Sequence, residues 1–433
     1  MASQPSTHPL SGIVDVDWRE LAPDGGPAIP GLLRGLCSAE SSVESALRLG
    51  EILNYPQPGH RAAPWAVPFL VRLACHPETP QPYDVLSLLH ELAAGVPGDR
   101  VPRFPGPEDL AEWRSEVAWV GSVSVDEARN HFQKVLDTAD TEQQRRRAGT
   151  QLAALDQPAG AEILAAELAT YEALSGEVSH LLELVTDSQL RSGEFVPQET
   201  ANLLALFPEH AETLIPALRA LEGATFVDDE EFASVLYAVG MLAGPQDTDS
   251  TAYLERFVDG EEDDPRTVAA AVGLVHQLGE AAPQRVGTVL GPWLSTPDLA
   301  EVFPSPFADV DDHGYLALTA RLLGEQGRWI CIDAYPTLFA GVDPETDDPS
   351  PLLADAFELV FGPRSKQQDT AQPDAFDSYS QDRQEVLWAV TELPAAAWEL
   401  PEVAETLAAW GLPDRRAEFL AFTGAVDADG DGD

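Results

Sequence analysis

The sequence predicts an all-α protein, organised as an α-solenoid in which short antiparallel helix pairs stack side by side. Three observations lead to this prediction: apolar residues recur at helical spacing along most of the chain, turns rich in Pro and Gly separate the helices, and one helix-pair motif occurs more than once. Two helices this short cannot bury their own apolar faces, so each pair needs neighbours on both sides. In such a stack the core grows with the length of the chain, here 433 residues.

Residues 65–95 contain one complete helix pair, divided by a proline-rich turn. We expect the first helix to open at Pro68, because proline lacks an N–H that the first turn of a helix does not use. The apolar stripes of the two helices are Phe69, Leu70, Leu73 and Ala74, then Val85, Leu88, Leu89 and Leu92.

A copy of this motif lies upstream, at residues 28–53, and aligns without a gap at the offset from Ala28 to Ala66, which is 38 residues. The matching positions are Ala28, Pro30, Leu32, Arg34 and Cys37 in the first copy and Ala66, Pro68, Leu70, Arg72 and Cys75 in the second. A third copy of the core, Ile-Pro-Ala-Leu-Arg, begins at Ile215. Three copies favour a repeat over chance.

Other helices follow from apolar residues three and four positions apart. After a proline-rich loop at 96–107 we expect helices at 109–120 and 125–136, the second capped by Ser124 with Glu127 at capping-box spacing. Later stripes are Leu181, Leu182, Val185; Leu203, Leu204, Phe207; Leu214, Ile215, Leu218, Leu221; Phe232, Val235, Leu236, Val239; Val268, Ala271, Val272, Val275; and Val286, Val289, Leu290, Trp293. Further helices are expected near 316–323, 352–361, 386–393 and 403–410, with a disordered excursion at 363–377.

These patterns divide the chain into five segments. They are helical repeats at 1–95, a proline-rich loop with irregular helices at 96–170, HEAT-like repeats at 171–295, C-terminal helices with acidic insertions at 296–424 and an acidic tail at 425–433.

The repeat motifs, together with the segments at 171–189 and 202–223, resemble bacterial HEAT-repeat domain proteins. The resemblance covers most of residues 28–295, and the 38-residue offset is close to the roughly 40-residue period of such helix pairs. It implies an α-solenoid and, by analogy, a protein-interaction scaffold, and it supplies no catalytic residues. The chain lacks the regular Asp-x-x-Val-Arg signature of the second helix.

The chain is strongly acidic, with 73 Asp and Glu against 25 Lys and Arg and a formal net charge of −48. Such a surface repels phosphate, so nucleic-acid binding is disfavoured, and the one basic triplet, Arg145–Arg147, better suits a solvated helix face. Two interpretations of the charge stay open: bulk solubility, as in a salt-rich cytoplasm, or attraction of a basic partner. Acid density peaks at 225–265 and 300–358.

Neither a membrane span nor a leader peptide is predicted, so we expect a cytoplasmic protein. Cys37, Cys75 and Cys331 are distant from one another and odd in number, which argues against disulfides or a metal knuckle. We expect them to be small core residues, with Cys37 and Cys75 buried at matching repeat positions.

Catalytic and metal-binding motifs are largely missing: no P-loop, GxGxxG, HExxH or GxSxG occurs. The densest histidine group is His60, His76 and His90 with nearby Glu91, and its spacing favours solvent-exposed histidines over a metal site. Residues 427–433 have the spacing of half a calcium loop, but the chain stops before the bidentate glutamate, so a disordered acidic tail is the simpler interpretation.

The sequence therefore predicts a non-catalytic protein–protein interaction scaffold or adaptor without cofactors, binding a basic protein or peptide and neither nucleic acid nor membrane. The alternative is a hydrolase or lyase whose acids and histidines converge from several helices. Paired carboxylates or an Asp–His pair deep in a cleft would favour the enzyme.

Overall fold

The computed structural model describes residues 8–54, 56–94, 107–138, 142–187, 196–224, 227–260, 264–295, 319–345, 347–362 and 375–425. Every regular element in these ranges is helical, which confirms the all-α prediction. The predictions for 96–106, 296–318, 363–374 and 427–433 lie outside the described residues. The chain divides into two compact units, Met1–Gly260 with Asp264–Gly273 and Glu261–Asp263 with Leu274–Asp433, and each is described by itself.

Unit 1 contains the predicted repeats. Its helices are α1 (Trp18–Leu21), α2 (Ile29–Gly35), α3 (Ser42–Leu53), α4 (Ala63–Ala74), α5 (Pro82–Ala94), α6 (Pro107–Val120), α7 (Val125–Thr138), α8 (Glu142–Leu155), α9 (Gly160–Ser175), α10 (Val178–Thr186), α11 (Val196–Leu204), α12 (Ala211–Arg219), α13 (Asp229–Leu242), α14 (Thr248–Val258) and the first part of α15 (Pro265–Leu278).

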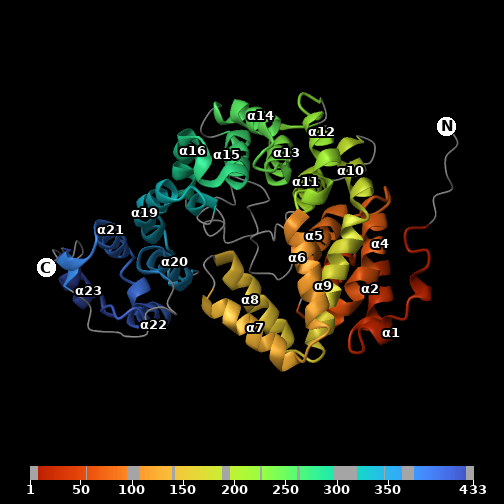
Figure 1. Cartoon of the computed structure of the whole chain (residues 1–433), viewed down its shortest axis with the longest axis horizontal. Helices are drawn as coiled ribbons and strands as arrows, with labels where there is room; N and C mark the ends of the chain where they lie inside the picture. Colours follow the sequence, from red (N-terminus) through yellow and green to blue (C-terminus); the bar gives the residue numbers. More distant parts are fainter. Residues whose placement is uncertain are drawn as a thin grey trace. The chain divides into compact units, whose positions relative to one another are not determined.

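Second helices of successive pairs pack in a row in unit 1. Helix α3 contacts α5, α5 contacts α11, and α11 contacts α13. Each also packs against the helix that precedes it in its pair: α2, α4, α10 and α12 respectively. The α10–α11 and α12–α13 pairs can be followed in Figure 1. The row continues from α13 to α15 through a close crossing, where Gly240 and Gly273 meet backbone to backbone. Apolar faces that a single pair would leave exposed are covered in this way.

Helices α6–α9 separate the second pair from the third along the chain. Helices α7 and α8 pack side by side as a hairpin (Figure 1), and their small core includes Phe132, Leu155 and Ile163. The predicted cap of α7 is present, because the Glu127 N–H donates to Ser124 Oγ at 3.3 Å. Helix α9 packs against α4, α5, α6 and α8, so its segment contacts the second helix pair, α4 and α5, directly.

The position expected for Pro68 was wrong. Helix α4 begins at Ala63, so Pro64 occupies the first turn and Pro68 lies inside the helix, as Pro216 does in α12. The Arg72 side chain donates from Nε to the Pro68 carbonyl at 2.8 Å. At the matching position of the first copy, Arg34 Nη1 donates to the Pro30 carbonyl at 3.2 Å, so the two copies share a local hydrogen bond as well as a sequence pattern.

Unit 2 continues with helices of similar length. They are α16 (Gln284–Leu294), α19 (Glu325–Ala340), α20 (Ser350–Phe361), α21 (Gln381–Val390), α22 (Pro401–Ala409) and α23 (Arg416–Thr423). Helix α19 packs between α16 and α21, and α20 contacts α21 and α22. The predicted helices at 352–361, 386–393 and 403–410 correspond to α20, α21 and α22, whereas α19 follows the stretch predicted at 316–323, of which only 319–321 is described as helical.

Candidate binding groove between α3 and α5

A groove of about 550 Å³ lies between α3 and α5 in unit 1. Its walls are single faces of the two helices, because the lining residues recur three and four positions apart on each. On α3 and just beyond its end they are Val43, Ala46, Leu47, Gly50, Glu51, Asn54, Pro56 and Gln57, and on α5 they are Tyr83, Asp84, Ser87, Leu88 and Glu91.

Two side-chain hydrogen bonds join the groove walls at opposite ends. Near the N-terminal ends of both helices, Ser42 Oγ donates to Asp84 Oδ2 at 3.5 Å. Near their C-terminal ends, Asn54 Nδ2 donates to Glu91 Oε2 at 2.7 Å. Helices α3 and α5 therefore run in the same direction, as equivalent helices of successive repeats do.

The α3 wall is apolar and open. Leu47 is 67% exposed and Val43 is 55% exposed, whereas Leu49 and Leu53 of the same helix are fully buried. Val43 and Leu47 are four residues apart, so they stand one above the other on the helix surface. Large exposed aliphatic side chains beside a concavity are typical of a surface that binds another molecule.

The groove carries carboxylates and no basic side chain among its lining residues. Asp84 lies toward one end, while Glu51 and Glu91 lie toward the other. Burial raises the pKa of Asp84, and the hydrogen bond from Ser42 only partly opposes that effect. Three carboxyl groups without a lining cation create a negative potential that favours a cationic ligand.

The groove floor is kept open by Gly50. A Cβ at this position would lie 3.4 Å from Asn54 Nδ2, 3.6 Å from Glu91 Oε2 and 3.8 Å from Leu88 Cδ1. These are ordinary contact distances, so a methyl group fits, whereas a longer side chain would extend into the groove.

Sequence patterns did not predict this site. The expected acidic field was at 225–265 and 300–358, and much of the second stretch lies outside the described residues. The available signal was the pair Val43 and Leu47, which stand beside the buried stripe of α3 and not in it. The helix that lies opposite Val43 and Leu47 is set by tertiary packing, and local sequence patterns do not predict that packing.

The histidine group is dispersed, and the expectation of solvent exposure was wrong. His60 is 1% exposed, with Nδ1 2.5 Å from the Leu53 carbonyl oxygen, because it belongs to a 3-10 turn packed against α3 and α4. His90 is half-buried with Nδ1 2.8 Å from Glu199 Oε1, which links α5 to α11, and His76 is half-buried too. No group of three potential metal ligands occurs among the described residues.

The cysteines also differ from expectation. Cys37 is exposed, Cys75 is half-buried and Cys331 is buried. Helix α2 ends at Gly35, so Cys37 lies beyond it on the surface. Cys75 directly follows Ala74, the last residue of the longer α4, and its Sγ lies 3.7 Å from the His180 carbonyl oxygen. Burial raises the pKa of Cys75 to about 12 and that of Cys331 to about 11, so neither is an activated thiol.

One polar cluster invites comparison with a nucleophilic site. Ser175 Oγ lies 2.9 Å from His210 Nε2 and 2.7 Å from Glu209 Oε1, and the Tyr171 hydroxyl donates to Glu209 Oε2 at 2.8 Å. In a Ser–His–acid triad the carboxylate orients the histidine through its other nitrogen. Here Glu209 accepts the serine proton itself, which leaves His210 Nε2 as a donor to Ser175 and not as its base. The cluster ties α9 to the start of α12.

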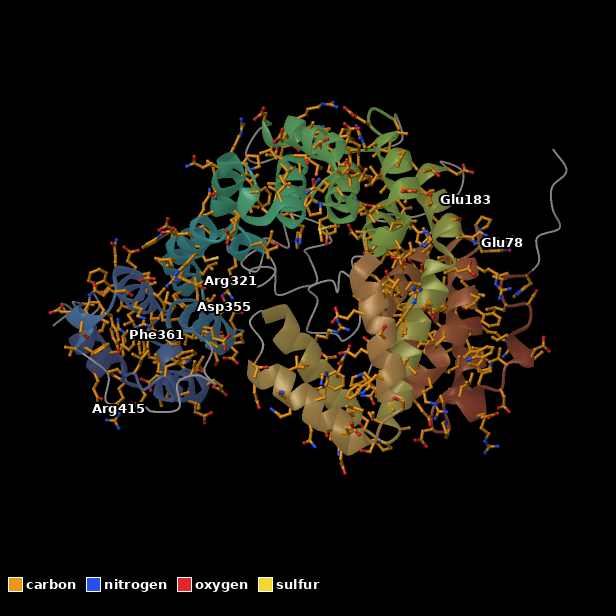
Figure 2. The ribbon with its side chains drawn as sticks, in the orientation of Figure 1. Glu78, Glu183, Arg321, Asp355, Phe361 and Arg415 are labelled. Atoms are coloured by element: carbon orange, nitrogen blue, oxygen red, sulfur yellow. The ribbon has the colours of Figure 1, made fainter. Side chains whose placement is uncertain are left out.

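A second polar cluster, in unit 2, joins three segments. Arg321 pairs with Asp355 of α20 (Figure 2). The Tyr335 hydroxyl of α19 donates to the other carboxylate oxygen of Asp355 at 2.9 Å. Burial, followed by the Asp355 charge, raises the pKa of Tyr335 far above its usual value. The salt bridge neutralises the half-buried Arg321, so we interpret the cluster as a structural link between α19, α20 and the segment that carries Arg321.

Comparisons with known proteins add no identification. No family model matches the chain, and neither a curated protein nor a solved structure matches it significantly. Among the described helices, none combines the length and the apolar character needed to cross a bilayer.

Proposed function

We propose that this chain is a non-catalytic interaction scaffold or adaptor that binds a basic protein or peptide in the groove between α3 and α5. The observation that carries the proposal is the groove itself, which combines an exposed apolar wall with three carboxylates and no lining cation. Binding sites of this kind gain affinity from buried apolar contacts and specificity from charge.

A HEAT-like solenoid is the architecture that fits this role. The row formed by α3, α5, α11 and α13, the shared direction of α3 and α5, and the common Arg–Pro carbonyl hydrogen bond all support stacked helix pairs. Equivalent helices of stacked pairs form one continuous face, and grooves between them are natural sites for an extended ligand.

The composition supports a basic partner and disfavours phosphate-bearing ones. With a formal charge of −48, the chain repels nucleic acid and anionic lipid over distances set by the ionic strength. The hydrolase or lyase alternative would require an activated nucleophile or general base, and the Ser175 cluster is not arranged as one.

The proposal is tested by affinity capture with the immobilised full chain at about 0.05 M and about 0.5 M salt, with retained proteins identified and quantified. An immobilised unrelated protein of similar acidity controls for bulk charge. We expect basic proteins that the control does not retain and that high salt releases. Capture of acidic or neutral proteins, or capture indifferent to salt, would show that the charge is only a solvation device.

A further inference from the structure

We propose that the occupant of the α3–α5 groove is a single amphipathic α-helix of the partner, with an apolar stripe flanked by Lys or Arg about seven residues apart. This inference rests on the proposed function and adds the partner's shape and residue pattern. Its argument comes from the dimensions of the groove, the spacing of its apolar wall and the position of its carboxylates.

The dimensions match one helix. Two parallel neighbouring helices pack about 8–10 Å apart and leave a channel into which the ridge of a third helix fits. Helix α3 has 12 residues, and at about 1.5 Å per residue it is roughly 18 Å long. A partner helix of about three turns would therefore fill the groove lengthwise.

The apolar wall has helical spacing. Val43 and Leu47 are one turn apart on α3, and Leu88 lies in the facing wall on α5. An apolar stripe with side chains three and four residues apart on the partner would place its own side chains at matching heights. The missing side chain at Gly50 leaves room for about one methyl group of the partner beside Leu88.

The carboxylates set the charge pattern. Asp84 and Glu91 are both on α5 and seven residues apart, which corresponds to two turns or about 10 Å along the groove. Glu51 on α3 shares the second end with Glu91, whose carboxylate is held in place by Asn54. A partner helix with basic residues at positions i and i+7 would therefore have a carboxylate at each end.

Other occupants fit less well. A second copy of this chain would bring another charge of −48. The segment 363–374 carries Arg364 and Lys366 but no aliphatic side chain larger than alanine, so it lacks the apolar stripe. The triplet Arg145–Arg147 belongs to α8, where Arg147 pairs with Glu116. The apolar wall on α3 and the carboxylates on α5 together favour a separate basic partner.

The test uses fluorescent synthetic peptides of about 16 residues, long enough for measurable helix formation, with the full chain titrated in by anisotropy. The patterned peptide carries two Lys seven residues apart with two Leu on the turn between them. A scrambled peptide has the same composition without the stripe. We expect the patterned peptide to bind the wild-type chain roughly tenfold more tightly than the scrambled one.

Variants of the chain locate the binding. Leu47→Ser should weaken the patterned peptide roughly tenfold, and Glu51→Gln by roughly threefold to fivefold, because each removes one groove contact. Val14→Ser, at a residue 78% exposed, and Glu44→Gln, at an exposed residue of α3, are matched controls because neither residue lines the groove, and they should change binding less than about twofold.

A filled groove gives an independent readout. Gly50→Leu places a side chain in the floor and should abolish peptide binding, whereas Gly31→Leu, at an exposed position of α2 with no atom near the added Cβ, should not. Circular dichroism melting of both variants checks the fold, and Leu47→Ser covers the case in which Gly50→Leu unfolds.

The possible outcomes separate the two proposals. Absence of binding by the patterned peptide, equal binding of the scrambled peptide, or equal effects of groove and control variants would overturn the helix assignment. If affinity capture still retains basic proteins in a salt-dependent way, the proposed function stands and only its site changes. If capture retains nothing above the control, the proposed function fails.

Discussion

At the scale of single residues, burial changes the protonation chemistry of His276 on α15. Burial lowers its pKa from 6.5 to about 4, and its Nε2 lies 3.4 Å from Thr319 Oγ1. A neutral imidazole is therefore built into unit 2. The unfolded chain has no such restriction, so the proton affinities of the two states differ.

This difference predicts a pH dependence of stability. As pH falls from 7 toward 4, the unfolded state binds a proton at about pH 6.5 while the folded state does not, so the contribution of His276 to stability falls through that window and changes no further below about 4. The loss is up to about 3 kcal/mol for this group. We expect chemical denaturation at pH 7 and pH 4.5 to show a smaller loss for His276→Gln than for wild type.

The comparison with the variant removes the effect of the carboxylates, which both proteins share. Identical pH dependence in the two proteins would mean that water reaches the imidazole of His276 and that its pKa is close to the usual value.

At the scale of helices, the sequence predicted the helices that bury a single apolar face, because such a face appears as a stripe of apolar residues at helical spacing. Helices α5, α12 and α16 have clear stripes, and their positions match the expectation. Helix α9 contacts four other helices, so apolar and small residues surround it and no stripe appears, and the sequence analysis did not identify it or α19. The groove was not predictable either, because it depends on which two helices stand side by side.

The crossing of α13 and α15 gives a prediction at this scale. A Cβ on Gly240 would lie 2.2 Å from the Gly273 Cα, a distance that no relaxed backbone accepts. Gly240→Ala must push the helices apart and should destabilise unit 1 by about 1–3 kcal/mol. Urea denaturation followed by circular dichroism measures the change.

Gly149→Ala is the matched control on α8, where nothing lies within 4 Å of the added Cβ. Alanine is the better helix former, so this substitution should stabilise the protein by up to about 1 kcal/mol. Opposite signs for the two substitutions support a close helix crossing. A neutral or stabilising effect of Gly240→Ala would place α13 and α15 farther apart than described.

At the scale of the whole molecule, the charge imbalance exceeds what ion pairing could compensate. Pairing all 25 basic residues would still leave 73 − 25 = 48 acids without a Lys or Arg partner. The described salt bridges involve arginines, such as Arg147 of α8 with Glu116 of α6, and Arg256 of α14 with Glu222. Repulsion among the remaining acids destabilises the compact state.

Salt should therefore stabilise the fold. Raising NaCl from about 0.1 M to about 1 M shortens the screening length from roughly 10 Å to roughly 3 Å, which weakens repulsion between separated acids more than attraction within close pairs. We expect the midpoint of thermal unfolding to rise over this range, and choline chloride to give a similar rise if screening is the cause. A falling midpoint would mean that the ion pairs dominate. A rise would mean that the acidic chain is most stable at high salt. Under those conditions a partner helix must rely on Val43 and Leu47 more than on Asp84 and Glu91, because apolar burial survives screening.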